Sequence, residues 1–194
     1  MKQMGGLNAR LAVGLVHYPV VNKFNEVVTS SVTTIDVHDI ARLCRTFGVP
    51  EFYVITPLSA QRRLVQRIMK HWIEGFGGEY NPDRREALSI VKVVDTIDDM
   101  MENLRFEKDD AALIVSSAHD SDSAVSYEAA RASLKKTGRA ALLFGTAHGL
   151  DGSVLLKADI RLKPVKGAGE YNHLPVRCAA SIILSGLLKQ DTEK

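Results

Sequence analysis

Phe144-Gly145-Thr146-Ala147-His148-Gly149-Leu150 forms a glycine-rich turn directly after the apolar segment 140–144. A second loop, Glu170-Tyr171-Asn172-His173-Leu174-Pro175-Val176-Arg177, opens into an apolar segment that reaches Leu188. Glycine allows tight turns and close backbone approach, and proline suits the first turn of a helix. Two loops of this kind around one short strand indicate a binding crevice at the end of a sheet, suited to a small organic cofactor.

Strand-like and helix-like segments alternate along the rest of the chain. Thr33 with Asp36 and Thr96 with Asp99 have the spacing of capping boxes, and Ser59 offers an N-cap. The alternation predicts an α/β fold with a largely parallel sheet and helices on both faces. Strands are expected in 11–17, 51–56, 90–94, 111–116, 140–144 and 159–162, and helices in 33–47, 59–73, 96–104, 126–136, 153–157 and 175–188.

Composition limits the class of protein. A chain of 194 residues that is 45% hydrophobic predicts one domain, 1–194. The longest apolar run, 179–188, is far shorter than the roughly 20 residues that a bilayer requires, so we expect a cytoplasmic protein without membrane contact. Cys44 and Cys178 lack metal-ligand spacing and fall on apolar helix sides, which predicts reduced core residues and no metal site.

Phosphate-binding motifs are missing from the sequence. No Gly-x-Gly-x-x-Gly follows the first strand, and no Gly-x-x-x-x-Gly-Lys-Ser/Thr occurs, which argues against a nicotinamide dehydrogenase or a nucleotide triphosphatase. The ends of three strands, at 116–119, 145–149 and 163–169, instead offer backbone groups to one ligand. For any one glycine taken alone, an ordinary strand-to-helix turn that requires a positive φ is the better explanation.

The ordered segments 143–150, 158–164, Gly167 and 171–184 resemble the C-terminal half of the SPOUT class of S-adenosylmethionine-dependent RNA methyltransferases, closest to a stand-alone branch of that class. The segment 36–49 and the strand after it resemble the first motif of the ribose-methylating branch. The resemblance implies a deep trefoil knot over approximately 111–188 and a homodimer through the knot. It implies S-adenosylmethionine as the cofactor and RNA, either tRNA or rRNA, as the substrate.

The resemblance also implies roles for individual residues. Arg42 aligns with an arginine that contacts RNA and assists the acceptor hydroxyl, whereas Asp36 stands where that branch usually has asparagine. For a base nitrogen, Asp36 or Asp39 would serve as general base. Asn172 either orients the acceptor or stabilises its loop, and His148 and His173 rank behind Arg42. The cofactor pocket would be lined by Ser116, Ser117, Phe144, Gly145, Thr146, Gly149, Ile160, Leu162, Gly167, Tyr171, Asn172, Leu174 and Val176.

Charge placement gives a weaker signal for RNA, because the net charge is only +2. Arg63, Arg67 and Lys70 recur at i, i+4 and i+7, and with Arg42 and Arg45 they are the expected RNA contacts. The alternative is that both groups form solvated helix faces.

Three functional hypotheses follow. The first is an S-adenosylmethionine-dependent RNA methyltransferase acting on a base nitrogen or a ribose hydroxyl. The second is a methyltransferase of a substrate other than RNA, which would bind the cofactor but not RNA. The third is a non-catalytic RNA-binding or assembly module, whose RNA affinity would not depend on the methyl donor.

Overall fold

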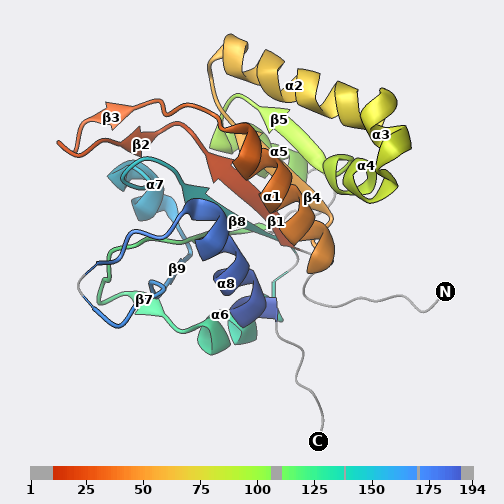
Figure 1. Ribbon diagram of the computed structural model, residues 1–194. Coiled ribbons are helices and arrows are strands. Elements are labelled where there is room, and N and C mark those ends of the chain that lie inside the picture. Colours follow the sequence, from red (N-terminus) through yellow and green to blue (C-terminus); the bar gives the residue numbers. More distant parts are fainter. Residues whose placement is uncertain (1–10, 106–110, 138, 170, 189–194) are drawn as a thin grey trace, which may run out of the picture.

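The computed structural model describes residues 11–105, 111–137, 139–169 and 171–188 (Figure 1). Its main sheet contains seven parallel strands in the order β5-β4-β1-β8-β6-β9-β7. These strands are β1 (Leu11–Val16), β4 (Glu51–Ile55), β5 (Val91–Val94), β6 (Ala111–Val115), β7 (Ala124–Val125), β8 (Arg139–Gly145) and β9 (Ile160–Leu162). A separate antiparallel pair is formed by β2 (Val20–Val21) and β3 (Val27–Val28).

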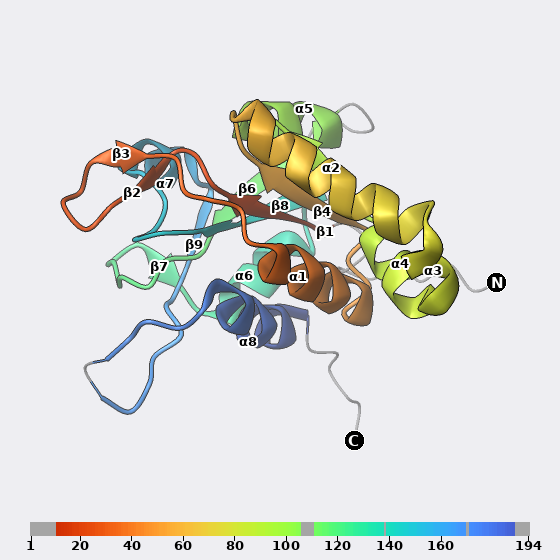
Figure 2. The same ribbon diagram turned by 45° about the horizontal axis from the view of Figure 1, so that its top comes forward.

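Helices cover both faces of the sheet, as the sequence predicted. Alternate residues of β1 enter different cores, because side chains of a strand point to opposite faces. One face carries α1 (Thr34–Thr46), α2 (Ser59–Ile73), α4 (Pro82–Leu88), α6 (Tyr127–Leu134) and α8 (Val176–Leu188). The other carries α5 (Ile97–Arg105) and α7 (Gly152–Lys157), and Figure 2 shows α5 across the sheet from α1 and α8.

Local sequence signals explain several boundaries. The Thr33 hydroxyl caps α1 by accepting from the Asp36 amide, and Gly48 follows the helix with a φ of 71°. Thr96 and Asp99 exchange side-chain-to-backbone hydrogen bonds of 2.9 and 3.0 Å, which confirms the second capping box.

Other expectations were wrong. Leu58, not Ser59, is the N-cap residue of α2, and no side chain caps that end. Cys44 is buried as expected, but Cys178 is exposed, because α8 turns it away from the core. The short helix α3 (Phe76–Tyr80), α4 and the two-residue strands were not predicted, since segments this short show too little periodicity.

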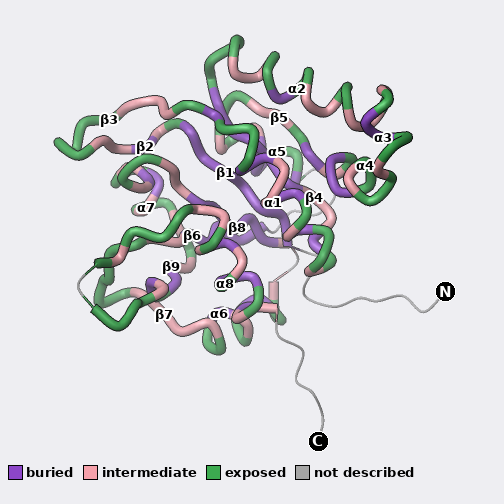
Figure 3. Tube along the Cα trace, viewed as in Figure 1, coloured by how far each residue is buried: buried purple, intermediate pink, exposed green. Residues whose placement is uncertain are grey.

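The C-terminal third of the chain passes from one side of β6 to the other and then returns. β8 pairs with one side of β6, and β9, which follows it along the chain, pairs with the other side. The exposed loop after β9 leads back to α8, which packs on α1 and α6 (Figure 3). The trefoil knot over approximately 111–188 stays a prediction that this path supports. Within the described ranges, no helix is both long and apolar enough to span a bilayer.

Candidate functional site

The predicted ligand loops lie at the carboxyl edge of the parallel sheet, where ligands of such sheets bind. Two contacts join the loop after β6 to the loop after β9. The Asn172 side-chain amide donates to the Ala118 carbonyl oxygen at 3.1 Å, and the Lys166 ammonium group lies 2.6 Å from an Asp120 carboxylate oxygen. Loops whose contacting residues are 46 and 54 positions apart in sequence are therefore neighbours in the fold.

The turn after β8 is held by its own backbone and by the end of β1. Ala147 and Gly149 have φ values of 52° and 115°, and the Gly149 amide donates to the Thr146 carbonyl oxygen. The Thr146 amide and hydroxyl both donate to the Val16 carbonyl oxygen. A Cβ atom on Gly145 would lie 2.7 Å from the Leu150 nitrogen, so this turn requires glycine at its start.

The other predicted pocket residues differ in what they offer. Ser116 donates to the Leu143 carbonyl oxygen, and Ser117 accepts from the His119 amide, so both hydroxyls support loop structure. Phe144 and Leu162 are buried in the core and offer mainly backbone groups to a ligand.

Exposed side chains and a glycine form the outer part of this region. Tyr171 is 80% exposed and Leu174 is 45% exposed, while a Cβ on Gly167 would meet only the Tyr171 carbonyl oxygen, at 3.7 Å. Val176 is half-buried at the start of α8. Exposed apolar groups beside accessible backbone fit the flat, mixed-polarity surface of an adenosine-containing ligand.

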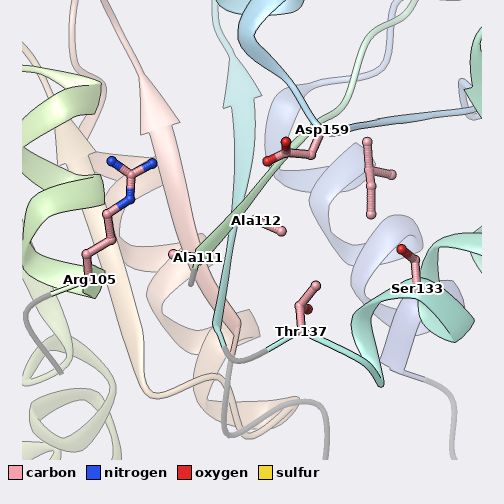
Figure 4. Close-up of a pocket in the computed structure, with 7 residues that line it drawn as sticks. Arg105, Ala111, Ala112, Ser133, Thr137 and Asp159 are labelled. Atoms are coloured by element: carbon pink, nitrogen blue, oxygen red, sulfur yellow. The ribbon is translucent and has the colours of Figure 1, made fainter. Parts of the chain in front are cut away.

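Ile160 stands apart from the other predicted pocket residues. It lines a cavity of about 430 Å³ at the amino ends of β6 and β9 (Figure 4). The Asp159 carboxylate at this cavity accepts from the Leu113 amide at 2.7 Å, which gives it a structural role. Because this cavity lies at the opposite ends of the strands from the glycine turn, we do not assign it to the cofactor. Its lining comprises Arg105, Ala111, Ala112, Ser133, Thr137, Asp159 and Ile160.

The candidate catalytic residues of α1 meet the start of α8, and the two helices lie side by side in Figure 1. The Arg177 guanidinium contacts the Asp36 carboxylate at 3.3 Å and the Asp39 carboxylate at 3.5 Å. The second Asp36 oxygen accepts from the Thr33 hydroxyl. Asp39 is also 3.8 Å from the Arg42 guanidinium, whose side chain is 59% exposed. Arg42 is thus linked through Asp39 to the first turn of α8, and its side chain remains exposed.

Arg177 is the residue whose role sequence reasoning missed. Its position in the first turn of α8 was the available signal, because the helix dipole disfavours a cation there. Such a cation requires a compensating partner, and Asp36 and Asp39 supply it.

The predicted RNA contacts fall into two groups. Arg45 of α1 is paired with Glu86 of α4. Arg63, Arg67 and Lys70 are exposed along α2 and form no ion pair with any residue in the described ranges. His148 and His173 are exposed in their loops, and the His173 ring packs edge-on against Tyr171.

A polar chain connects the glycine turn to the end of β1. His17 Nδ1 lies 2.9 Å from the Ser30 hydroxyl, which also contacts the Thr146 hydroxyl. Because the Val16 carbonyl only accepts, Thr146 donates to it, Ser30 donates to Thr146, and His17 donates to Ser30. The His17 Nδ1 atom therefore carries a proton. Burial lowers the pKa of His17 to about 4, despite the opposing effect of Asp36.

This low pKa predicts an acid sensitivity of the fold. His17 in the unfolded chain gains a proton as the pH falls below about 6.5, whereas folded His17 stays neutral until about pH 4, so folding stability falls over this window by on the order of 3 kcal/mol. His17→Asn keeps an amide donor for Ser30 but does not titrate. The free energy of unfolding of wild type and variant can be measured in urea at about pH 7.5 and pH 4.5. It should fall less between these two pH values for His17→Asn than for wild type. Equal losses would contradict this assignment.

Comparison with known proteins adds independent information. Residues 10–189 match the sequence profile of a family described as SAM-dependent RNA methyltransferase. The chain is 39% identical over 178 residues to a tRNA (guanine-N(1)-)-methyltransferase of Oleidesulfovibrio alaskensis, a match that covers 92% of this chain but 42% of that relative. It is 34% identical to an uncharacterized protein of Aquifex aeolicus, covering 95% and 91% of the two chains.

The fold also matches a solved structure. The SpoU methyltransferase AviRb from Streptomyces viridochromogenes, in complex with AdoMet, superimposes with a TM-score of 0.56 at 15% identity. The match covers 94% of this chain and 58% of that one. At this identity the likeness concerns the fold, which agrees with the SPOUT resemblance of the sequence.

Proposed function

Because the chain belongs to the family of S-adenosylmethionine-dependent RNA methyltransferases, we propose that it methylates a ribose hydroxyl of tRNA. The main support is the contact between Arg177, directly after the cofactor loop, and the Asp39 carboxylate that also faces Arg42. The choice of tRNA rests on the name of the Oleidesulfovibrio relative, of which this chain spans 42% of the length.

Bound S-adenosylmethionine supplies an activated methyl group on a sulfonium centre. The residues that would hold it are the strand-end serines Ser116 and Ser117, the turn 145–149, and the segment 162–176. Arg42, oriented by Asp39, would bind the RNA backbone and stabilise the negative charge that develops on the acceptor oxygen. Asn172 would anchor its loop through Ala118 and touch no reacting atom.

Asp36 is poorly suited to act as general base. One of its oxygens contacts Arg177 and the other accepts from Thr33, so neither is free for a substrate proton. We therefore assign Asp36 a positioning role, in which it fixes the first turn of α8 against α1.

A second candidate acceptor is the N1 atom of guanine. The name of the Oleidesulfovibrio relative favours it. Asp39 would then be the base, after one of its contacts with Arg42, at 3.8 Å, or Arg177, at 3.5 Å, is given up to the substrate. Because this chain covers 42% of that relative, the named activity can belong to the remaining part of that protein.

One assay tests the proposal and separates these acceptors. Purified protein is incubated with methyl-labelled S-adenosylmethionine and either bulk tRNA or bulk rRNA, and the products are digested to nucleosides. We expect label in 2′-O-methyl nucleosides of tRNA. Label in 1-methylguanosine would establish the second candidate instead. Calorimetric titration with S-adenosylmethionine, with ATP and NAD as controls, measures cofactor binding separately. If the protein binds S-adenosylmethionine but transfers no label to tRNA or rRNA, the result would favour a substrate other than RNA.

We further propose that the protein works in the cytoplasm as a homodimer through the C-terminal region. Leu174 and Ile182 are each 45% exposed, and Ile182 and Cys178 lie on the same side of α8 at i+4 spacing. Ile182→Asp should shift the protein from dimer to monomer in analytical ultracentrifugation, because a charge would be buried at the interface. Leu156→Asp, on α7, is the matched control, and an unchanged dimer in Ile182→Asp would exclude this face.

A further inference from the structure

Two aromatic side chains of α3 lie in solvent. Phe76 and Tyr80 are 71% and 80% exposed, and their rings stack with centroids 6.2 Å apart and planes 29° apart. Large apolar groups that are exposed together mark interaction surfaces more often than single exposed residues do. This pair belongs to none of the site residues described above.

The packing of α3 fixes this exposure. Gly77 and Gly78 are buried against α2, where a Cβ on Gly78 would lie 2.2 Å from the Trp72 carbonyl oxygen. A Cβ on Gly77 would lie 2.7 Å from the His71 ring. Since the two glycines occupy the inner side, the aromatic residues at i and i+4 are directed outward.

Cations lead from the carboxyl edge of the sheet to this pair. Arg62, at the start of α2, donates to the Thr56 carbonyl oxygen at the end of β4. Arg63, Arg67 and Lys70 follow, separated by about 6 Å and 4.5 Å along the helix axis. Figure 1 shows α3 and α4 at the far end of α2, where the Arg84 guanidinium lies over the Trp72 ring.

We propose that Phe76 and Tyr80 form a stacking platform for unpaired bases of the RNA substrate, with the cations of α2 binding the phosphates that lead to it. The proposal rests on RNA being the substrate. Stacked aromatic rings at the end of a basic track are the combination with which proteins bind single-stranded RNA. The 15 residues of α2 span about 22 Å, so the platform holds nucleotides several positions from the methylated one.

Charge and stacking make separable contributions here. Glu74 and Glu79 are exposed beside the rings, so stacking rather than charge dominates binding at the platform. Arg63, Arg67 and Lys70 instead give the salt dependence, because phosphate contacts release counterions.

The test compares RNA affinities by fluorescence anisotropy. The probes are labelled bulk tRNA and an unstructured RNA of about 20 nucleotides, with a duplex of the same length as control. Phe76→Ala/Tyr80→Ala should weaken binding of the single strand by about 10- to 100-fold while leaving the salt slope unchanged. Arg67→Gln/Lys70→Gln should reduce the salt slope by about 1 to 2. Duplex affinity should be unchanged in the aromatic variant.

Matched variants keep the interpretation specific. Leu156→Ala removes an equally exposed apolar side chain, 81% accessible, from the other face of the sheet and should bind RNA normally. Phe76→Tyr/Tyr80→Phe keeps both rings and should restore affinity. Unchanged single-strand affinity in Phe76→Ala/Tyr80→Ala would contradict the proposal. If that variant instead loses the dimer while its RNA affinity stays intact, Phe76 and Tyr80 form a contact between two copies of the chain, which also contradicts the proposal. If wild-type protein binds no RNA, the proposed function fails as well.

Discussion

Gly145→Val is expected to abolish S-adenosylmethionine binding. A Cβ at this position would lie 2.7 Å from the Leu150 nitrogen and 2.9 Å from the Gly149 carbonyl carbon, and both are backbone atoms that cannot rotate away. The turn would have to open, which displaces the Thr146 contacts to Val16 and removes the glycine loop from the proposed pocket. Calorimetry should show a loss of cofactor affinity of at least about 100-fold, with a fold destabilised by about 1–3 kcal/mol.

Other glycines provide controls for this variant. Gly145→Ala places a Cβ against the same backbone atoms and should also lose affinity for S-adenosylmethionine. It replaces the valine variant in the test if that variant fails to fold. Gly152→Ala adds a methyl group where no atom lies within 4 Å and should leave affinity and stability intact. Gly167→Ala, with its one contact at 3.7 Å, should have a small effect on affinity. Normal cofactor binding by Gly145→Val would show that the pocket lies elsewhere.

Arg42→Ala is expected to reduce methyl transfer to tRNA by about 100-fold or more while leaving S-adenosylmethionine affinity unchanged. The side chain is exposed and faces Asp39 from 3.8 Å, so its loss removes a charge from the acceptor side without opening the core. Folding stability should change by less than about 1 kcal/mol, because exposed ion pairs contribute little. Single-turnover rates and calorimetric titration of the same preparations separate the two effects.

Two further variants define the role of Arg42. Arg42→Lys keeps the charge but loses the planar fork, so it should recover only part of the rate. Thr46→Ala changes an exposed residue at the end of the same helix and should be fully active. Equal rates for wild type and Arg42→Ala would remove Arg42 from the mechanism.

The local sequence predicted most of the fold because its signals span few residues. The apolar runs of β1 and β4, the caps at Thr33 and Thr96, and the apolar segment of α8 each carry their own periodicity or capping pattern. The helices α3 and α4 show too little periodicity, since both are short and glycines take the inner side of α3. The start of α4 does carry a local signal, because Asn81 caps it and Pro82 occupies its first turn.

The loops proposed to bind the cofactor, and Arg42, were named from the sequence because they form recognisable ordered motifs, and the family match of residues 10–189 supports the class of enzyme. The contact between Arg177 and Asp36, on the same helix as Arg42, could not be predicted in this way. Asp36 and Arg177 are 141 residues apart, and no local pattern links an acidic residue in one helix to a basic residue in another.

By itself, the sequence determined the order of the longer strands and helices, the glycine turn and the family, because each depends on patterns and motifs that are read directly along the chain. Only the tertiary structure decided the order of strands in the sheet, the contact of α1 with α8 and the outward direction of Phe76 and Tyr80. These features depend on how distant apolar surfaces pack together. The free energy of this packing arises from contacts between distant segments, so no single segment contains the information that determines it.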